Sequence, residues 1–159
     1  MSKMIIIDQQ ACTGCRQCEL VCSVKQTGTA DPSRSRISVV KWEAEGFYLP
    51  SVCQQCTEPA CVTVCPKNAL TRDDVNDRVL HDDDLCIGCK MCVMACPFGA
   101  MGVDTKEKRI YKCEHCGGDP TCVKFCDAGA LRFVDTDIAN LAKKRAHAAR
   151  FSLLMRATS

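Results

Sequence analysis

The sequence has few aromatic residues and no long apolar run. Only 5% of its 159 residues are aromatic, so packing alone is not expected to stabilise a large core. No segment approaches the roughly 18 consecutive apolar residues of a membrane-spanning helix, and no twin-arginine leader precedes the first cysteine. The cysteine-rich part also lacks the basic stripe with interleaved aromatics of nucleic-acid-binding proteins. We therefore expect a cytoplasmic chain with no direct membrane span and no nucleic-acid partner.

Cysteine, in contrast, is abundant. Sixteen cysteines would indicate disulfides in a secreted chain, but in a reducing compartment they point to metal binding. They form four quartets separated by spacers of 30, 20 and 16 residues, and no cysteine is left over. The quartets are Cys12, Cys15, Cys18 and Cys22; Cys53, Cys56, Cys61 and Cys65; Cys86, Cys89, Cys92 and Cys96; and Cys113, Cys116, Cys122 and Cys126.

The spacing within the quartets predicts iron-sulfur clusters. In the run Cys-x2-Cys-x2-Cys, three thiolates can wrap a compact iron-sulfide cube and reach three different irons, and the fourth cysteine ligates the other cluster of a pair. Structural zinc is the alternative, because two Cys-x2-Cys pairs with a longer spacer form one tetrahedral site. The second and fourth quartets fit that alternative better than the first and third, which have no separated second pair.

Glycine and histidine residues also lie within or near the quartets. Gly14 and Gly88 precede the second cysteine of the two regular quartets, where a missing side chain is expected to let backbone N–H groups approach cluster sulfur. His115 lies inside the last quartet, where it can be compared with the histidine ligands of Rieske centres. Since the neighbouring cysteines already complete a quartet, we do not expect His115, His81 or His147 to be a ligand.

Short segments beside the quartets predict strands at residues 4–7, 37–40, 79–81 and 131–134, with loops at 28–33 and 117–120. From Asp137 the chain is alanine-rich and contains no cysteine, glycine or proline, which predicts a basic C-terminal helix over 137–159. This helix either packs on its own domain or docks on a partner or on a further copy of the chain. The fold class is therefore α+β and loop-rich.

The two inner quartets differ from the outer two, because only they are followed by proline, at Pro66 and Pro97. The inner pair, CPKNAL and then CIGCKMCVMACP, resembles a bacterial two-cluster ferredoxin. We expect an inner ferredoxin-like module at 50–104, inserted in an outer one formed by 1–49 and 105–136. With the fourth cysteines crossed, the expected ligands are Cys12, Cys15, Cys18 and Cys126 (cluster 1); Cys113, Cys116, Cys122 and Cys22 (cluster 2); Cys53, Cys56, Cys61 and Cys96 (cluster 3); and Cys86, Cys89, Cys92 and Cys65 (cluster 4).

Over nearly all of residues 3–136, the sixteen-cysteine pattern resembles the four-cluster ferredoxin-type subunits that serve molybdenum- or tungsten-pterin oxidoreductases. That group includes dimethyl sulfoxide reductases, formate dehydrogenases and tungsten aldehyde oxidoreductases, and the chain is most similar to the electron-transfer subunit of the soluble tungsten enzymes. The resemblance implies four 4Fe-4S clusters and the crossed ligand sets. It also implies two partners, a pterin-containing catalytic subunit and a flavin subunit or soluble ferredoxin.

The sequence offers no sign of catalysis by the chain itself, because it has no nucleophile–base constellation, no phosphate-cradling glycine loop and no catalytic carboxylate pair. The acidic run at 82–84 is interpreted as a solvated turn. We therefore interpret the chain as a carrier of single electrons from aldehyde oxidation at a pterin subunit to a flavin subunit or ferredoxin. The same carrier can instead serve a hydrogenase, formate dehydrogenase or carbon monoxide dehydrogenase, and a zinc-binding interaction module is the alternative of a different class.

Four oxidised clusters of formal charge two minus would change the net charge from +2 to −6, so the basic residues are expected to compensate internally.

Overall fold

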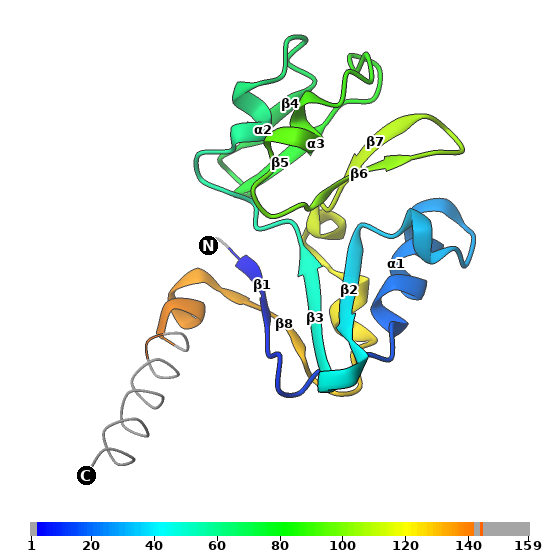
Figure 1. The fold of residues 1–159 in the computed structure, drawn as a ribbon. Coiled ribbons are helices and arrows are strands. Elements are labelled where there is room, and N and C mark those ends of the chain that lie inside the picture. Colours follow the sequence, from blue (N-terminus) through cyan, green and yellow to red (C-terminus); the bar gives the residue numbers. More distant parts are fainter. Residues whose placement is uncertain (1–2, 142–143, 145–159) are drawn as a thin grey trace.

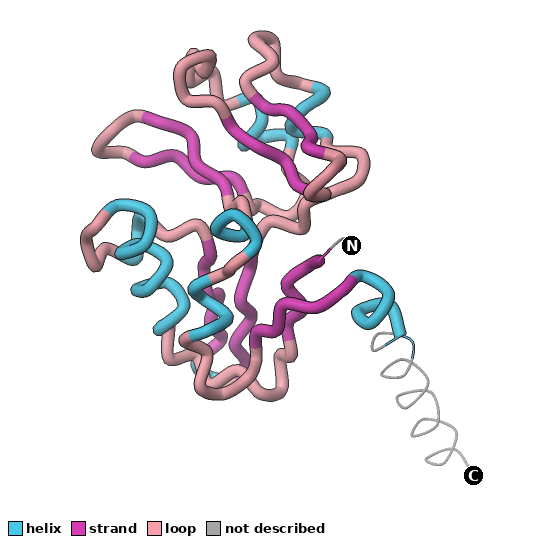
Figure 2. The backbone as a smooth tube through the Cα atoms, turned by 180° about the vertical axis from the view of Figure 1, so that it is seen from behind, coloured by secondary structure: helices cyan, strands magenta, loops and turns pink. Residues whose placement is uncertain are grey.

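The structure is a computed structural model that describes residues 3–141 and 144. It confirms a small, loop-rich α+β fold, and Figure 2 shows how much of the chain lies in loops. The strands are β1 (Lys3–Ile7), β2 (Ile37–Trp42), β3 (Phe47–Val52), β4 (Leu70–Asp73), β5 (Arg78–His81), β6 (Met101–Asp104), β7 (Arg109–Lys112) and β8 (Leu131–Asp135). The helices are α1 (Gln17–Thr27), α2 (Ala60–Thr63), α3 (Met91–Ala95) and α4 (Thr121–Lys124), with short 3-10 turns η1 (Pro32–Arg34), η2 (Glu43–Glu45) and η3 (His115–Gly118).

The strands in the described part of the chain form four two-stranded antiparallel sheets. β1 pairs with β8 from Lys3 opposite Asp135 to Ile7 opposite Leu131, so the two ends of the cysteine-rich region lie side by side (Figure 1). The other three sheets are the local hairpins β2–β3, β4–β5 and β6–β7. The four predicted strands coincide with parts of β1, β2, β5 and β8 and are confirmed.

The hairpins β4–β5 and β6–β7 have equivalent turns. Asp73 ends β4 and Asp104 ends β6, and each carboxylate accepts the backbone N–H groups two and three residues further on, at 2.9 to 3.1 Å. Asp77 and Lys108 then adopt a left-handed backbone, with φ of 52° and 55°. Aspartate favours such turns because its short side chain bonds to backbone close by. After each turn the chain reverses direction and forms the second strand of the hairpin, β5 or β7, which leads to the third or the fourth quartet of cysteines.

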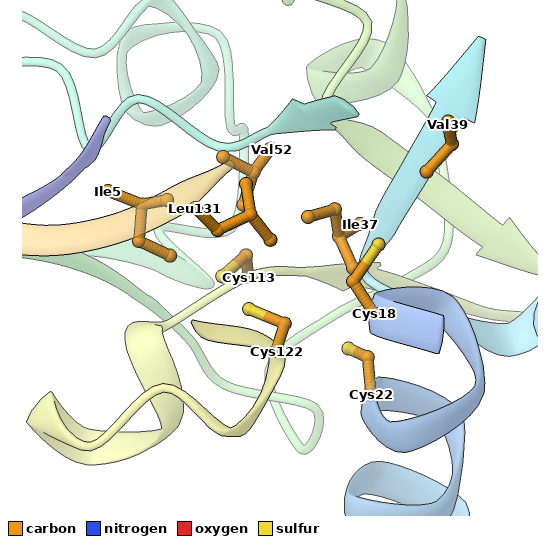
Figure 3. Close-up of a cluster of buried hydrophobic side chains, with 9 residues drawn as sticks. All are labelled: Ile5, Cys18, Cys22, Ile37, Val39, Val52, Cys113, Cys122 and Leu131. Atoms are coloured by element: carbon orange, nitrogen blue, oxygen red, sulfur yellow. The ribbon is translucent and has the colours of Figure 1, made fainter. Parts of the chain in front are cut away.

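The apolar core is divided into two clusters of side chains. The larger one packs β1, β2, β3 and β8 against α1 and α4, and it includes four cysteines; Figure 3 shows Ile5, Cys18, Cys22, Ile37, Val39, Val52, Cys113, Cys122 and Leu131. The smaller cluster packs the two inner hairpins against α3 and consists of Leu70, Val79, Cys92, Met101 and Ile110. Both clusters are small, as the low aromatic content predicts, and sulfur-containing side chains make up a large part of each. Bound metal is then the expected source of the remaining stability.

Polar contacts join the parts of the chain that contain these two clusters. The 31–34 segment contacts the β6–β7 hairpin through ion pairs of Arg34 with Asp104 and of Lys106 with Asp31. At a second contact, the amide of Gln55 donates to the Cys113 carbonyl at 2.7 Å and accepts from the Val79 N–H at 2.8 Å. The predicted module boundary at 49/50 lies inside β3, and the boundary at 104/105 lies in the turn between β6 and β7.

The segment after β8 begins a helix. Residues 136–141 are helical, and Ala139 is fully buried while Ile138 and Leu141 are exposed. This part agrees with the predicted C-terminal helix, and the rest of that prediction, at 142–143 and 145–159, lies outside the described residues. Within the described chain, no helix combines the length and the apolar character needed to cross a membrane.

Candidate metal centres

All sixteen cysteines lie in the described part of the chain, and none of them forms a disulfide. The third cysteine of each quartet occupies the second position of a helix: Cys18 in α1, Cys61 in α2, Cys92 in α3 and Cys122 in α4. The fourth cysteine lies within α1 in the first quartet and just after the helix in the other three. Because α1 packs on α4 and α2 packs on α3, the cysteines of the outer quartets lie together, as do those of the inner quartets.

A shared backbone conformation precedes the second cysteine of every quartet. The residue there has a positive φ: 67° for Gly14, 50° for Gln55, 69° for Gly88 and 54° for His115. A left-handed residue reverses the chain over a short distance, which lets the first and second cysteines approach from different sides. The positive φ is therefore one reason for glycine at two of these positions. The predicted approach of backbone N–H groups to cluster sulfur is a second reason. The longer quartets reach the same conformation with glutamine and histidine.

The first group of cysteines surrounds a hollow beside the large core. Cys12, Cys15, Cys18 and Cys126 line this hollow, which is partly open to solvent, together with apolar side chains that include Val39, Pro50 and Leu131. Burial raises the pKa of Cys18 to about 12, and the charges of Glu19, Cys15 and Cys126 contribute to the shift. Three cysteines of the first quartet thus meet the last cysteine of the fourth quartet.

A second hollow lies beside the smaller core cluster. Cys65, Cys86, Cys89 and Cys92 line this hollow, which is also partly open to solvent, with His81, Ile87 and Ile110 among its other walls. The sulfur of Cys65 is surrounded by backbone donors: burial raises its pKa, but the N–H groups of residues 67–70 outweigh burial and lower it overall. A sulfur that accepts several N–H bonds is stabilised as the thiolate, the form that ligates metal.

The remaining eight cysteines form two further groups. Burial raises the pKa of Cys122, and the neighbouring charges that add to this shift are those of Cys113, Cys22 and Cys116, followed by that of Cys18 from the first hollow. Burial likewise raises the pKa of Cys61, with contributions from Cys53 and Cys96. Cys56 and Cys96 both act on Cys53. The sixteen cysteines can therefore be divided into four adjoining neighbourhoods, each with three members of one quartet and one of its partner quartet, and Cys18–Cys122 and Cys53–Cys113 are neighbours across them.

Donors of the protein point at several of these sulfurs. The backbone N–H of Arg36 donates to Cys22 Sγ at 3.3 Å, that of His115 donates to Cys113 Sγ at 3.4 Å, and the Gln26 amide lies 3.8 Å from Cys116 Sγ. Such hydrogen bonds stabilise thiolate ligands and are one determinant of the reduction potential of an iron-sulfur cluster.

The arrangement fits clusters better than isolated ions. Among residues 3–141 and 144, no three side chains of His, Cys, Asp or Glu converge as the ligands of one ion do. In a 4Fe-4S cluster each thiolate binds a different iron, so its four sulfurs surround a larger object and need not converge on one atom. The two hollows, each bounded by four cysteines and otherwise by mainly apolar groups, have the composition of a site for such an object.

The histidines occupy different environments. His115 is 4% exposed, burial lowers its pKa to about 4, and its Nε2 has no hydrogen-bond partner in the described residues. Its ring packs edge-on against Phe133, with ring centroids 5.4 Å apart. Burial also lowers the pKa of His81, which faces Asp83 at 3.5 Å. His147 lies outside the described residues.

The acidic run at 82–84 is an exposed turn, held by the Asp82 carboxylate, as predicted.

Three buried polar residues had no sequence signal that distinguished them. Lys112 is 1% exposed, and Glu19 is 2% exposed with its Oε1 accepting the Val39 N–H at 2.6 Å. Gln55 is also buried and joins the two parts of the chain. All three lie within two residues of a cysteine, and that proximity is the only pattern that could have drawn attention to them.

Four neighbourhoods of four cysteines, with the third cysteine of each quartet in a helix and small hairpins between the quartets, define a ferredoxin-type iron-sulfur protein. Comparison with known families agrees: the family described as 4Fe-4S dicluster domain matches residues 44–136, and a 4Fe-4S binding domain matches residues 9–25. The chain belongs to the 4Fe-4S dicluster domain family and binds 4Fe-4S clusters, and its sixteen cysteines fit four of them. This assignment decides against the zinc alternative.

Curated proteins of oxidoreductase complexes are similar over most of the chain. It is 38% identical to the polyferredoxin-like subunit of aliphatic sulfonate oxidoreductase of Pyrococcus furiosus, covering 82% of this chain and 76% of that one. It is 35% identical to the B subunit of anaerobic dimethyl sulfoxide reductase of Escherichia coli, covering 95% and 81%. The subunit beta of NADH-dependent phenylglyoxylate dehydrogenase of Aromatoleum evansii is 36% identical over 83% of this chain, which spans only 30% of that protein.

Among solved structures, a chain of the active site complex BamBC of benzoyl coenzyme A reductase, as isolated, has a similar fold. The TM-score is 0.51 and the sequence identity is 25%, with 94% of this chain and 90% of that chain covered. The similarity supports the ferredoxin-like architecture of the chain.

Proposed function

We propose that the chain is a non-catalytic electron-transfer subunit that carries single electrons through four 4Fe-4S clusters within an oxidoreductase complex. The observation that supports this most strongly is the grouping of all sixteen cysteines into four neighbourhoods. Each bound cluster supplies a one-electron redox couple whose potential depends on nearby charge, hydrogen bonds and exposure. The residues of the chain hold the clusters at fixed positions and set these surroundings.

The proposed ligands are the crossed sets predicted from the sequence. Cluster 1 is assigned to Cys12, Cys15, Cys18 and Cys126; cluster 2 to Cys22, Cys113, Cys116 and Cys122; cluster 3 to Cys53, Cys56, Cys61 and Cys96; and cluster 4 to Cys65, Cys86, Cys89 and Cys92. Each set is supported by one of the neighbourhoods described above. Clusters 1 and 2 would form the outer module (1–49 and 105–136) and clusters 3 and 4 the inner module (50–104).

The same contacts support a linear order of the clusters. α1 contains both Cys18 of cluster 1 and Cys22 of cluster 2. Clusters 2 and 3 are linked through Cys113, whose neighbours include Cys53. α3 contains Cys92 of cluster 4 and is followed at once by Cys96 of cluster 3. Cys15 and Cys89, in clusters 1 and 4, are the two exposed cysteines of the sixteen. Electrons would therefore enter and leave at these two ends.

The proposed partners are a tungsten- or molybdenum-pterin aldehyde oxidoreductase subunit at one end and a flavin subunit or soluble ferredoxin at the other. The cysteine pattern resembles subunits of pterin enzymes, and the relatives include a subunit of dimethyl sulfoxide reductase. A cytoplasmic location belongs to the same proposal, because free thiols and oxygen-sensitive clusters suit a reducing compartment. The basic tail after Asp137 is proposed to dock on a partner or on another copy of the chain, since a cluster-loaded surface is expected to be acidic.

Multi-element metal analysis of the complex that co-purifies with the tagged chain, isolated without oxygen, tests the proposed partner. Tungsten or molybdenum in stoichiometric amount supports the pterin enzyme and says which metal it contains. Nickel would instead favour a hydrogenase or carbon monoxide dehydrogenase. A parallel preparation of the chain without residues 138–159, compared by native mass spectrometry, tests the tail: an assembly of unchanged composition contradicts docking.

A further inference from the structure

Lys112 is a buried lysine without an acidic partner. It ends β7, directly before Cys113, and is 1% exposed. Its Nζ donates hydrogen bonds to the carbonyl of Val79 and, at 2.7 Å, to the carbonyl of Cys113. In the described part of the chain, no carboxylate lies within ion-pair distance of it. A buried ammonium is costly unless it is both hydrogen-bonded and paired with negative charge, and here only the first condition is met by protein groups.

Lys112 lies next to loops that contain several of the proposed ligands. The Cys113 carbonyl that accepts from Lys112 Nζ also accepts from the side-chain amide of Gln55, which lies between Cys53 and Cys56 in the chain. In keeping with this placement, burial raises the pKa of Cys53, Cys61 and Cys113, and the charge of Lys112 opposes that shift at each of them. The thiolate sulfurs of these cysteines are therefore a source of negative charge for the buried ammonium.

These sulfurs belong to two different proposed clusters. Cys53 and Cys61 are assigned to cluster 3, and Cys113 is assigned to cluster 2. The ammonium thus lies where the outer module meets the inner one, next to the Gln55 contact that joins Cys113 to Val79. No helix is shared between the two clusters here, in contrast to α1 and α3, which link the clusters within each module.

We propose that Lys112 is a fixed positive charge shared by clusters 2 and 3, which stabilises their reduced states and raises their reduction potentials relative to those of clusters 1 and 4. The inference rests on the proposed function, because it uses the ligand sets given there. Reduction adds one negative charge to a cluster, and a nearby cation in a buried site favours that form. Lys112 would act through its charge, by adjusting the potentials of the two clusters between which an electron passes from one module to the other.

Redox titration followed by EPR, on the cluster-loaded chain, tests this role with Lys112→Met, which keeps the length of the side chain and removes its charge. At a fixed solution potential, the reduced-to-oxidised ratio of two clusters should fall about tenfold, which corresponds to about 59 mV for a one-electron couple. The other two clusters should be unchanged. Lys124→Met is the matched control, because Lys124 is an exposed lysine on the helix that contains Cys122, and it should shift none of them.

Two further readouts separate the possible outcomes. Iron content shows whether clusters are present: a wild-type chain without them overturns the proposed function, whereas loaded variants with four unchanged potentials overturn only the role of Lys112. Equal shifts of all four clusters would also contradict it. If Lys112→Met fails to load clusters 2 and 3, the Lys112→Arg variant decides between charge and shape. Retention of both clusters with unchanged potentials would show that the positive charge is what the site requires. Loss of both clusters would show that the site requires the shape of lysine, which would overturn the proposed role of its charge.

Discussion

Two glycines at equivalent positions allow a sharp test of how the cluster loops are built. Gly14 and Gly88 precede the second cysteine of their quartets and have nearly the same φ, 67° and 69°. A Cβ at Gly88 would come no closer than 3.8 Å to another atom, the carbonyl oxygen of Lys108. A Cβ at Gly14 would lie 2.6 Å from the ring of Tyr48. The two positions therefore share backbone strain and differ in steric overlap.

The expected costs follow from this difference. Gly88→Ala should lower the free energy of unfolding by about 1–2 kcal/mol, the cost of a left-handed conformation for a residue with Cβ. Gly14→Ala should add about 1–3 kcal/mol of overpacking to the same strain. The Tyr48 ring cannot easily swing away, because its hydroxyl donates to Glu43 and Lys41 lies over the ring. For a chain of this size, each kcal/mol changes the melting temperature by about 2–4 °C.

Thermal unfolding of the two cluster-loaded variants, prepared without oxygen, measures the difference. Tyr48→Ala provides the control, since removal of the ring should recover most of the extra loss in Gly14→Ala and none of the loss in Gly88→Ala. EPR of the same samples should show cluster 1 altered in Gly14→Ala and cluster 4 unaffected. Equal melting temperatures for the two glycine variants, or no recovery in the Tyr48→Ala background, would refute the reasoning.

Three other predictions follow from the structure. Cys22→Ser should abolish or alter cluster 2 and leave cluster 1 intact by EPR; the reverse pattern would contradict the crossed ligand sets. Glu19→Ala should lower the free energy of unfolding by about 3 kcal/mol, because it removes a buried carboxylate that accepts the Val39 N–H. Glu19→Gln keeps an acceptor and should lower it clearly less, and equal losses for the two variants in chemical denaturation would exclude this explanation. Hydrogen bonds from Lys106, the largest cause, and from Ser33 lower the pKa of Asp31 from 3.8 to about 2, so these contacts stabilise the fold above about pH 4 and their contribution is lost as the pH falls toward 2. The stability difference between wild type and Lys106→Met should therefore shrink over that window, and a difference independent of pH would count against it.

The cysteine spacing was sufficient to predict the class of cofactor and the α+β character of the fold, because a quartet of closely spaced thiols has few physical uses. The strands β1, β2, β5 and β8 were also predictable from short runs of β-branched residues. β4 and β6 were not, since LTRD and MGVD carry little β signal. Their pairing depends on the aspartate turns at Asp73 and Asp104, which become recognisable only when the two hairpins are compared.

The sequence could not have predicted the polar contacts between the two halves. Lys112 and Gln55 look like ordinary surface residues in the sequence, and their burial results from the docking of segments far apart in the chain. Helix α1 is another example: Cys18 and Cys22 are spaced as in the other quartets, but here the helix continues to Thr27 and ends at Gly28, with φ of 73°. The spacing of cysteines is local information, whereas these features depend on tertiary packing.

Iron and acid-labile sulfide per chain, measured after purification without oxygen, test most directly whether the sixteen cysteines hold four clusters. Four cubes of four irons and four sulfides require about sixteen of each per chain, with no stoichiometric zinc. About eight irons, the content of a single two-cluster module, would contradict the assignment of all four quartets, and zinc in place of iron would contradict the electron-transfer function itself.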